Sequence, residues 1–188
     1  MDHTLAGKTI AFMVASGFEE SEFTEAQRAL LKAGATLRVL STDQGLVNGW
    51  HGKGWGHYFP VDKAIGEALG ADYDMLVLPG GERSVAKLSQ SAHTRRIVGH
   101  FLDAGKPVAA MDHGIQLLAV PGKMRGLKVV APESLHDAVT AAGGQIVTDT
   151  TLVEDRNVVT ACGLEALPDC VATLLRVFAE AGNLKNAA

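Results

Sequence analysis

Short apolar runs alternate along the chain with longer segments that show helical periodicity. Residues 9–15, 75–78 and 108–111 are such runs, each bounded by turn-forming residues. Runs of this kind are typical of strands that are covered on both faces, as in a parallel sheet. Residues 95–104, by contrast, gather their apolar positions on one side of a helix. The alternation predicts an α/β fold with a doubly wound, mostly parallel sheet sandwiched by helices.

Three junctions between a predicted helix and the following strand contain glycine. They include Gly34, Gly105 and Gly144, each of which precedes an apolar strand. Glycine just past a helix adopts the left-handed conformation that ends the helix without a steric clash. The junctions therefore support the same fold. Ligands of such folds bind at the carboxyl ends of the strands, so the loops that follow strands are the places to look for chemistry.

Two regions depart from the alternation. Residues 45–58 are rich in glycine and hold both tryptophans of the chain, so we expect a hairpin or flap there. Residues 152–160 are predicted to form two strands joined by a turn. A helix over residues 167–181 closes the fold, and residues 182–188 are predicted to fray. No stretch resembles a linker, so we expect a single domain that spans residues 1–188.

The composition excludes several classes of function. The 188 residues carry a formal net charge of −4, and no cluster of Lys and Arg is long enough for a nucleic-acid surface. No stretch reaches the roughly 18 apolar residues of a membrane span, and no secretory signal is recognisable. Cys162 and Cys170 form neither a disulfide framework nor a metal cluster, and both are expected to be packed. We expect a cytoplasmic protein with no nucleic-acid partner, membrane association or cofactor.

The sharpest candidate for chemistry follows the predicted strand at 108–111. Asp112 ends this strand, and a helix begins almost at once. Such a turn presents the side chain at the top of the sheet, beside helix N–H groups that favour negative charge. Aspartate is also a favoured helix-capping residue. The local sequence leaves both interpretations open, a cap or a functional carboxylate.

Two further loops follow predicted strands. Gly80 and Gly81 come after the strand at 75–78, and paired glycines let backbone amides approach a ligand, as an oxyanion hole requires. Taken alone, Pro-Gly-Gly is also an ordinary turn. Glu19 and Glu22 follow the first strand, in the segment Gly-Phe-Glu-Glu-Ser-Glu. Acidic residues that lead a helix commonly interact with its dipole.

Together these segments resemble the DJ-1/PfpI superfamily, and its PfpI-like branch most. The matching segments are Gly-Phe-Glu-Glu-Ser-Glu, Leu-Pro-Gly-Gly and Gly-Lys-Pro-Val-Ala-Ala-Met-Asp-His-Gly. Shorter matches at residues 52–53, 61–62, 124–126 and 159–161 extend the resemblance over nearly the whole chain. It implies a flavodoxin-like sheet of the class I glutamine amidotransferase type, also named ThiJ. It further implies a homodimer or larger homo-oligomer, and a stress response among the functions to consider.

The resemblance also implies a set of site residues. In the family the turn is Cys-His-Gly, and its cysteine is the nucleophile at a nucleophile elbow. His113 and Gly114 match this motif, but Asp112 stands where the cysteine is expected. Glu22 corresponds to the glutamate that hydrogen-bonds the nucleophile, with Glu19 as the reserve. The catalytic candidates are therefore Asp112, His113, Glu22 and Glu19, with Gly80, Gly81 and Gly114 expected at the oxyanion hole.

Other residues are expected near this site. PfpI-type proteins take a second glutamate from a neighbouring subunit, and Glu82 is its nearest counterpart here. Arg83 and His57 are further candidates for the pocket, although exposed loop histidines are commoner than ligating ones. Trp50 and Trp55 would either line the pocket or anchor a subunit interface. No pair of histidines has metal-ligand spacing, so no metal is expected.

A carboxylate at position 112 changes the expected chemistry. It is a much poorer nucleophile than a thiolate, so thiol-dependent protease, glyoxalase or deglycase activity is not expected. The first hypothesis is a hydrolase or hydratase/lyase that acts on a small polar molecule through an Asp112/Glu22 pair. Two adjacent acids cannot both ionise cheaply, so one pKa rises and a proton is shared. The pair would act as general acid and base, or Asp112 would form an ester that His113 or water resolves.

Two alternatives remain open at this level. One is a non-catalytic binding or stress-response protein that retains the pocket but has lost thiol chemistry. The other is that Asp112 has been introduced into a thiol-dependent PfpI-type hydrolase or glyoxalase, because a carboxylate resembles a sulfinate in shape. In either case a small-molecule ligand is the expected partner.

Overall fold

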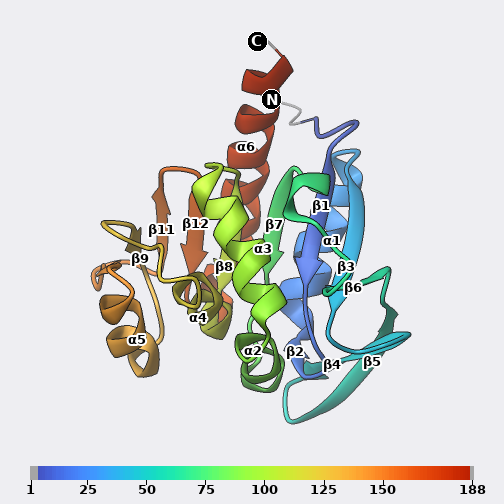
Figure 1. Ribbon diagram of the computed structural model, residues 1–188, viewed down its shortest axis with the longest axis horizontal. Coiled ribbons are helices and arrows are strands. Elements are labelled where there is room, and N and C mark those ends of the chain that lie inside the picture. The colour runs from blue at the N-terminus through green and yellow to red at the C-terminus, as the bar shows by residue number, and fades with distance from the viewer. Residues whose placement is uncertain (1–3, 187–188) are drawn as a thin grey trace.

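The computed structural model describes residues 4–186 of the chain. Its centre is a seven-stranded sheet between layers of helices (Figure 1). Neighbouring strands pair in parallel, except that β11 runs antiparallel to β12 at one edge. From that edge the order is β11 (Leu152–Asp155), β12 (Val158–Ala161), β8 (Val108–Met111), β7 (Met75–Leu78), β1 (Thr9–Met13), β3 (Thr36–Ser41) and β6 (Lys63–Ala64).

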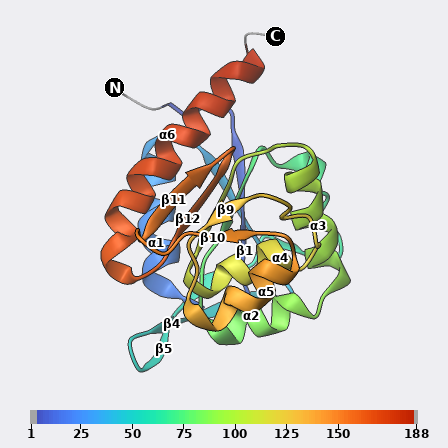
Figure 2. The ribbon, with the colours of Figure 1, turned by 90° about the vertical axis from the view of Figure 1, so that its left-hand side faces the viewer.

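Helices cover both faces of the sheet, as the side view in Figure 2 shows. Side chains alternate between the two faces along each strand. Ile10 and Phe12 of β1 pack with α1 and α6, whereas Ala11 and Met13 pack with the opposite layer. With both faces buried, the strands are continuous apolar runs. One layer is α1 (Glu20–Lys32) and α6 (Leu167–Asn186), and the other is α2 (Glu82–Ser89), α3 (Ala92–Asp103), α4 (Gln116–Ala119) and α5 (His136–Ala141).

A small sheet stands beside the carboxyl ends of the central strands. It pairs β2 (Phe18–Glu19) with the hairpin of β4 (Leu46–His51) and β5 (Gly54–Pro60), at the lower right in Figure 1. The ring of Phe59 on β5 lies 4.8 Å from that of Phe23 on α1, which anchors the hairpin to the body of the protein. The remaining elements are the pair β9 (Lys128–Val129) and β10 (Gln145–Ile146), and the 3-10 turns η1 (Gly70–Asp72), η2 (Asp112–Ile115), η3 (Glu133–Leu135) and η4 (Leu164–Ala166).

The structure confirms the predicted fold class and changes some boundaries. The hairpin expected at residues 45–58 is present as β4 and β5. The frayed tail predicted from residue 182 is wrong as far as Asn186, because α6 continues to that residue. Gly182 is buried and packs near Met75 at the start of β7, which supports the additional turn. Residues 187–188 lie outside the described part of the chain. None of the helices within residues 4–186 is long and apolar enough to cross a membrane.

Candidate active site

A cavity of about 700 Å³ opens where β1, β7, β8 and β12 reach their carboxyl ends. Each of these strands is followed by a segment that contributes to the wall, and Trp50 of the hairpin completes it. Open α/β sheets bind their ligands at this edge. The lining residues are Gly17, Glu19, Glu22, Trp50, Gly81, Glu82, Arg83, Asp112, His113, Pro132, Cys162, Gly163 and Leu164.

Asp112 lies at the turn between β8 and the following helix, in an unusual backbone conformation. Its φ of 45° falls in the left-handed region, which costs a non-glycine residue about 1–2 kcal/mol. The side chain does not cap its own helix. Instead its Oδ1 accepts a hydrogen bond of 2.8 Å from the N–H of Gly163, which follows β12. The helix-cap interpretation of Asp112 is therefore not what the structure shows, and its carboxylate faces the cavity.

Glu22, in the first turn of α1, meets Asp112 from the other side. Its side chain is 2% exposed, and its Oε2 accepts a hydrogen bond of 2.6 Å from the Gly80 N–H. Burial, followed by a hydrogen bond to Asp112 and the charge of Asp112, raises the pKa of Glu22 well above its ordinary value. The raised pKa favours a neutral Glu22, which can share its proton with Asp112.

Gly80 allows the two carboxyl groups to meet. A Cβ at this position would lie 3.0 Å from Glu22 Oε2 and 3.2 Å from Asp112 Cβ, closer than most such contacts. Glu19, the reserve candidate, lies at the cavity wall and adds a negative charge that also raises the pKa of Glu22. The structure thus brings Glu22, and not Glu19, into hydrogen-bonding contact with Asp112.

His113 points toward the rim of the cavity. Its Nε2 lies 3.2 Å from Oε1 of Glu82, at the start of α2. The Glu82 side chain is 79% exposed and that of His113 is 28% exposed, so the pair stands at the mouth. Two carboxyl groups in contact and a histidine at the rim are groups of the kind that can exchange protons with a bound small molecule.

Comparison with known proteins identifies the chain's relatives. A family model described as DJ-1/PfpI family matches residues 8–177. The chain belongs to this family. Protein/nucleic acid deglycase 2 of Escherichia coli (strain K12) is 32% identical over 172 residues, which cover 91% of this chain and 98% of that protein. General stress protein 18 of Bacillus subtilis (strain 168) is 31% identical over 163 residues, covering 86% and 92%. A solved ThiJ/PfpI domain protein from Brachyspira murdochii matches with a TM-score of 0.80 at 23% identity, over 92% of this chain and 96% of that one.

The backbone donors expected from the DJ-1/PfpI resemblance are only partly placed for that role. Gly80 donates its N–H to Glu22, so this amide is already occupied. Gly114 is not part of the cavity wall, and a side chain there would collide with the carbonyl oxygen of Leu78. Its small size lets the turn pack against the end of β7. Gly81 does line the cavity, with a φ of 100° that favours glycine.

Both cysteines have raised pKa values, which disfavours the thiolate expected from the DJ-1/PfpI resemblance. Cys162 was expected to be packed, but it is only half-buried and lines the cavity beside Asp112. Burial, together with the charge of Asp112 and a hydrogen bond to it, raises the pKa of this thiol to about 11. Cys170 is buried, and burial raises its pKa to about 12. Both thiols are therefore protonated near neutral pH.

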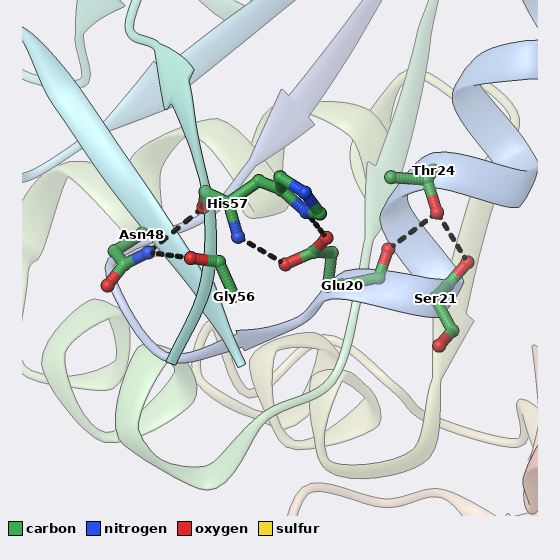
Figure 3. Close-up of polar contacts among 6 residues, drawn as sticks. All are labelled: Glu20, Ser21, Thr24, Asn48, Gly56 and His57. Carbon is green, nitrogen blue, oxygen red and sulfur yellow. Dashed lines mark hydrogen bonds and ion pairs between the residues drawn. The ribbon is translucent and has the colours of Figure 1, made fainter. Parts of the chain in front are cut away.

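His57 does not join the cavity, although it was a candidate for the pocket. Figure 3 shows it on β5, turned toward Glu20 of α1. Its Nδ1 lies 2.5 Å from Glu20 Oε1, and its backbone N–H donates a hydrogen bond of 2.8 Å to Glu20 Oε2. The amide of Asn48 holds the facing strand by donating to the carbonyl oxygens of Gly56 and His57. Thr24 secures the helix turn through the carbonyl oxygens of Glu20 and Ser21.

The sequence reasoning missed two residues of the site. Gly163 supplies the N–H that holds Asp112, and Cys162 lies beside the same carboxylate. Both follow β12 directly, and β12 is the parallel neighbour of β8. A rule that treats the first residues after every central strand as candidates would have found them. Within residues 4–186, no group of three or more His, Cys, Asp or Glu side chains is arranged to hold a metal ion.

Proposed function

We propose that this DJ-1/PfpI family member is an enzyme that hydrolyses, hydrates or dehydrates a small polar molecule through an Asp112/Glu22 acid–base pair. One observation carries the proposal: Glu22 has a strongly raised pKa and shares a hydrogen bond with Asp112 at the wall of a cavity. Carboxyl groups whose pKa values are pushed apart by their surroundings are suited to serve as acid and base.

Asp112 is the base in this proposal. Its carboxylate accepts a proton from a water molecule, whose oxygen then forms a bond to the electrophilic carbon of the substrate. The proton passes from Asp112 to the leaving group or to the substrate oxygen, which restores the carboxylate. The Gly163 N–H and the neutral Glu22 carboxyl orient Asp112 and stabilise its charge between these steps. His113 and Glu82, at the mouth, are the second route for protons.

We further propose that Asp112 occupies the position of the family's nucleophilic cysteine, and that thiol chemistry is lost in this chain. The raised pKa values of Cys162 and Cys170 support this view, because neither thiol can replace the missing nucleophile near neutral pH. Relatives named as deglycases support an activity of the hydrolase type at a coarse level. Those names describe the relatives, and the chemistry of this chain follows from its own carboxylates.

The test is a screen of small carbonyl compounds, amides and nitriles against the wild type, Asp112→Asn and Glu22→Gln. We expect Asp112→Asn to lower kcat/KM at least about 100-fold, since it removes the base. Glu22→Gln is expected to lower kcat and to move the pH profile, because the shared proton is no longer available. Glu25→Gln, on the exposed side of α1, is the matched control and should leave turnover unchanged.

Other results would point elsewhere. Equal turnover by the wild type and Asp112→Asn would overturn the acid–base proposal. If no compound is turned over, and both variants bind a ligand as well as the wild type, the chain is a binding protein. A gain of glyoxalase or peptidase activity in Asp112→Cys would show that the rest of the site keeps the design of thiol-dependent relatives, as expected if the aspartate was introduced.

We propose a homodimer, or a larger homo-oligomer, as the working form, and the cytoplasm as its location, where unpaired thiols stay reduced. The exposed aromatic residues of the hairpin support self-association: Trp55 is 57% exposed and Tyr58 is 68% exposed. Such residues are enriched at interfaces. Light scattering on the eluting protein should give a mass of at least two chains. A single-chain mass at all concentrations would contradict this proposal.

A further inference from the structure

Arg83 is the only arginine or lysine in a cavity wall that carries four carboxyl groups. It lies in the first turn of α2, after β7, on an exposed part of the wall. Surface arginines usually lie beside a carboxylate when one is near, and this wall offers several. The carboxyl groups are those of Glu19, Glu22, Glu82 and Asp112.

The neighbours of Arg83 confine its side chain. Gly17 gives it room, because a Cβ at Gly17 would lie 2.5 Å from Arg83 Cβ and 3.3 Å from its Cδ. The guanidinium carbon then lies 4.3 Å from the centre of the Trp50 ring and 5.8 Å from that of Trp55. The two indoles meet edge to face with centroids 5.3 Å apart. Stacking of this kind holds a guanidinium while its edge N–H groups remain available.

No side chain in residues 4–183 uses those N–H groups. Among the described residues, no carboxylate forms an ion pair with Arg83 and no group forms a hydrogen bond with its guanidinium. The nearest acidic residue in sequence, Glu82, pairs with His113 instead. A stacked guanidinium with unused donors, in the cavity of Asp112, is arranged to receive an oxyanion from outside the chain.

We infer that Arg83 binds an anionic oxygen-acid group of the substrate, a carboxylate or a phosphate, while Asp112 acts on the polar centre of the same molecule. This inference rests on the proposed function, because both residues line one cavity. The substrate class is then a short acid that carries a hydroxyl, carbonyl or amide group. Planar N–H pairs bind such groups with two parallel hydrogen bonds, which fixes the orientation of the molecule.

Tryptophan fluorescence provides the test, because both tryptophans of the chain lie beside the Arg83 guanidinium. Glycolate, glycerol phosphate and the neutral glycolamide would be titrated at constant ionic strength into the wild type, Arg83→Gln and Arg83→Lys. We expect saturable binding of at least one anion, weakened at least about tenfold in Arg83→Gln and less in Arg83→Lys. Arg28→Gln, an exposed arginine of α1 outside the cavity, is the control and should bind as the wild type does.

Comparing the two anions shows whether Arg83 binds the carboxylate of a carboxylic acid or the phosphate of a phosphate ester. A dependence on Arg83 for glycolate assigns a carboxylic acid, and for glycerol phosphate a phosphate ester. Anion affinity that is unchanged in Arg83→Gln, saturable binding of neither anion, or an equal loss of glycolamide binding would overturn the inference. Failure of turnover, by contrast, affects only the proposed acid–base chemistry, because these titrations do not require a reaction.

A measurement on the wild type guards against a misfolded variant. Phenylglyoxal modifies accessible guanidinium groups, and peptide mass spectrometry reports the modified fraction at each arginine. The anion that binds should slow the modification of Arg83 at least about tenfold when the site is saturated, and leave Arg28 unchanged. Equal rates at Arg83 with and without both anions would contradict the inference.

Discussion

Two glutamates in the first turn of α1 are both buried, yet their surroundings shift their pKa values in opposite directions. Glu20 is 6% exposed and faces the hairpin, whereas Glu22 is 2% exposed and faces the cavity. Burial raises the pKa of each. At Glu20, the hydrogen bonds from the His57 ring and N–H, and the charges of His57 and His51, outweigh burial and lower the pKa. At Glu22, the hydrogen bond and charge of Asp112 add to burial.

The comparison shows that partners, and not burial alone, decide the ionisation of a carboxyl group. Glu20 contacts both the backbone N–H and the ring of His57 and so holds β5 against α1, as Figure 3 shows, and its lowered pKa favours the carboxylate. Glu22 has one amide donor and two acidic neighbours, Asp112 and Glu19, so its pKa is raised and the neutral acid is favoured. The first is a structural contact, and the second has the properties expected of a reactive group. The same helix turn thus serves the fold on one side and the site on the other.

The largest change in stability is expected from Gly56→Ala, which disturbs the contacts of Glu20. A Cβ at Gly56 would overlap Oε2 of Glu20, so the carboxylate would have to turn away from its present position. The hydrogen bonds from His57 would be lost or lengthened. Loss of hydrogen bonds to a charged group predicts a decrease of about 1.5–3 kcal/mol in the free energy of unfolding. Urea denaturation at neutral pH measures this difference.

Gly54→Ala is the matched control for this variant. It lies on the same strand, and a Cβ at Gly54 would meet nothing within 4 Å, so its stability should stay close to that of the wild type. The lowered pKa of Glu20 adds a second check. Its stabilising contribution is present above the ordinary glutamate pKa and is lost as the pH falls toward its folded-state pKa. Part of the Gly56→Ala effect should therefore disappear in acid, and an effect no larger than that of Gly54→Ala would contradict this account.

The sequence predicted the fold and the turn at Asp112 because both depend on local patterns. Apolar runs covered on both faces are visible as composition, and a strand followed at once by a helix places its last polar residue at the sheet edge. The choice between Glu19 and Glu22 required the register of β2 and α1. The partner that distinguishes Glu22 is the N–H of Gly80, in a loop 58 residues further along the chain, and that contact is not visible in the sequence.

The contacts of Glu20 and Arg83 could not be predicted, because they occupy space that is free only where a glycine has no side chain. Gly56 and Gly17 each make room for a side chain from another element. In the sequence these glycines look like the other turn glycines of the chain. Their role follows only from which segments lie side by side, and the same is true of the position of His57 beside Glu20 rather than in the cavity.

A smaller change in stability is expected from Glu22→Gln, which alters the second of the two glutamates. An acid whose pKa is raised in the folded state binds a proton there that the unfolded chain has released. The free energy of unfolding of the wild type must then fall as the pH rises above the ordinary glutamate value of 4.5 toward the raised one. Glutamine can accept from the Gly80 N–H and donate to Asp112, as the neutral acid does, but it does not titrate.

Glu22→Gln should therefore match the wild type in acid and become the more stable protein toward neutral and alkaline pH. Urea denaturation across the pH range, with the exposed Glu25→Gln as the control, isolates this difference. The gain in stability should accompany the loss of turnover, because a group held away from its preferred ionisation is costly to the fold and useful to the site. If the difference between Glu22→Gln and the wild type stays constant with pH, Glu22 does not hold a proton. The contrast with Glu20 would then be one of position alone.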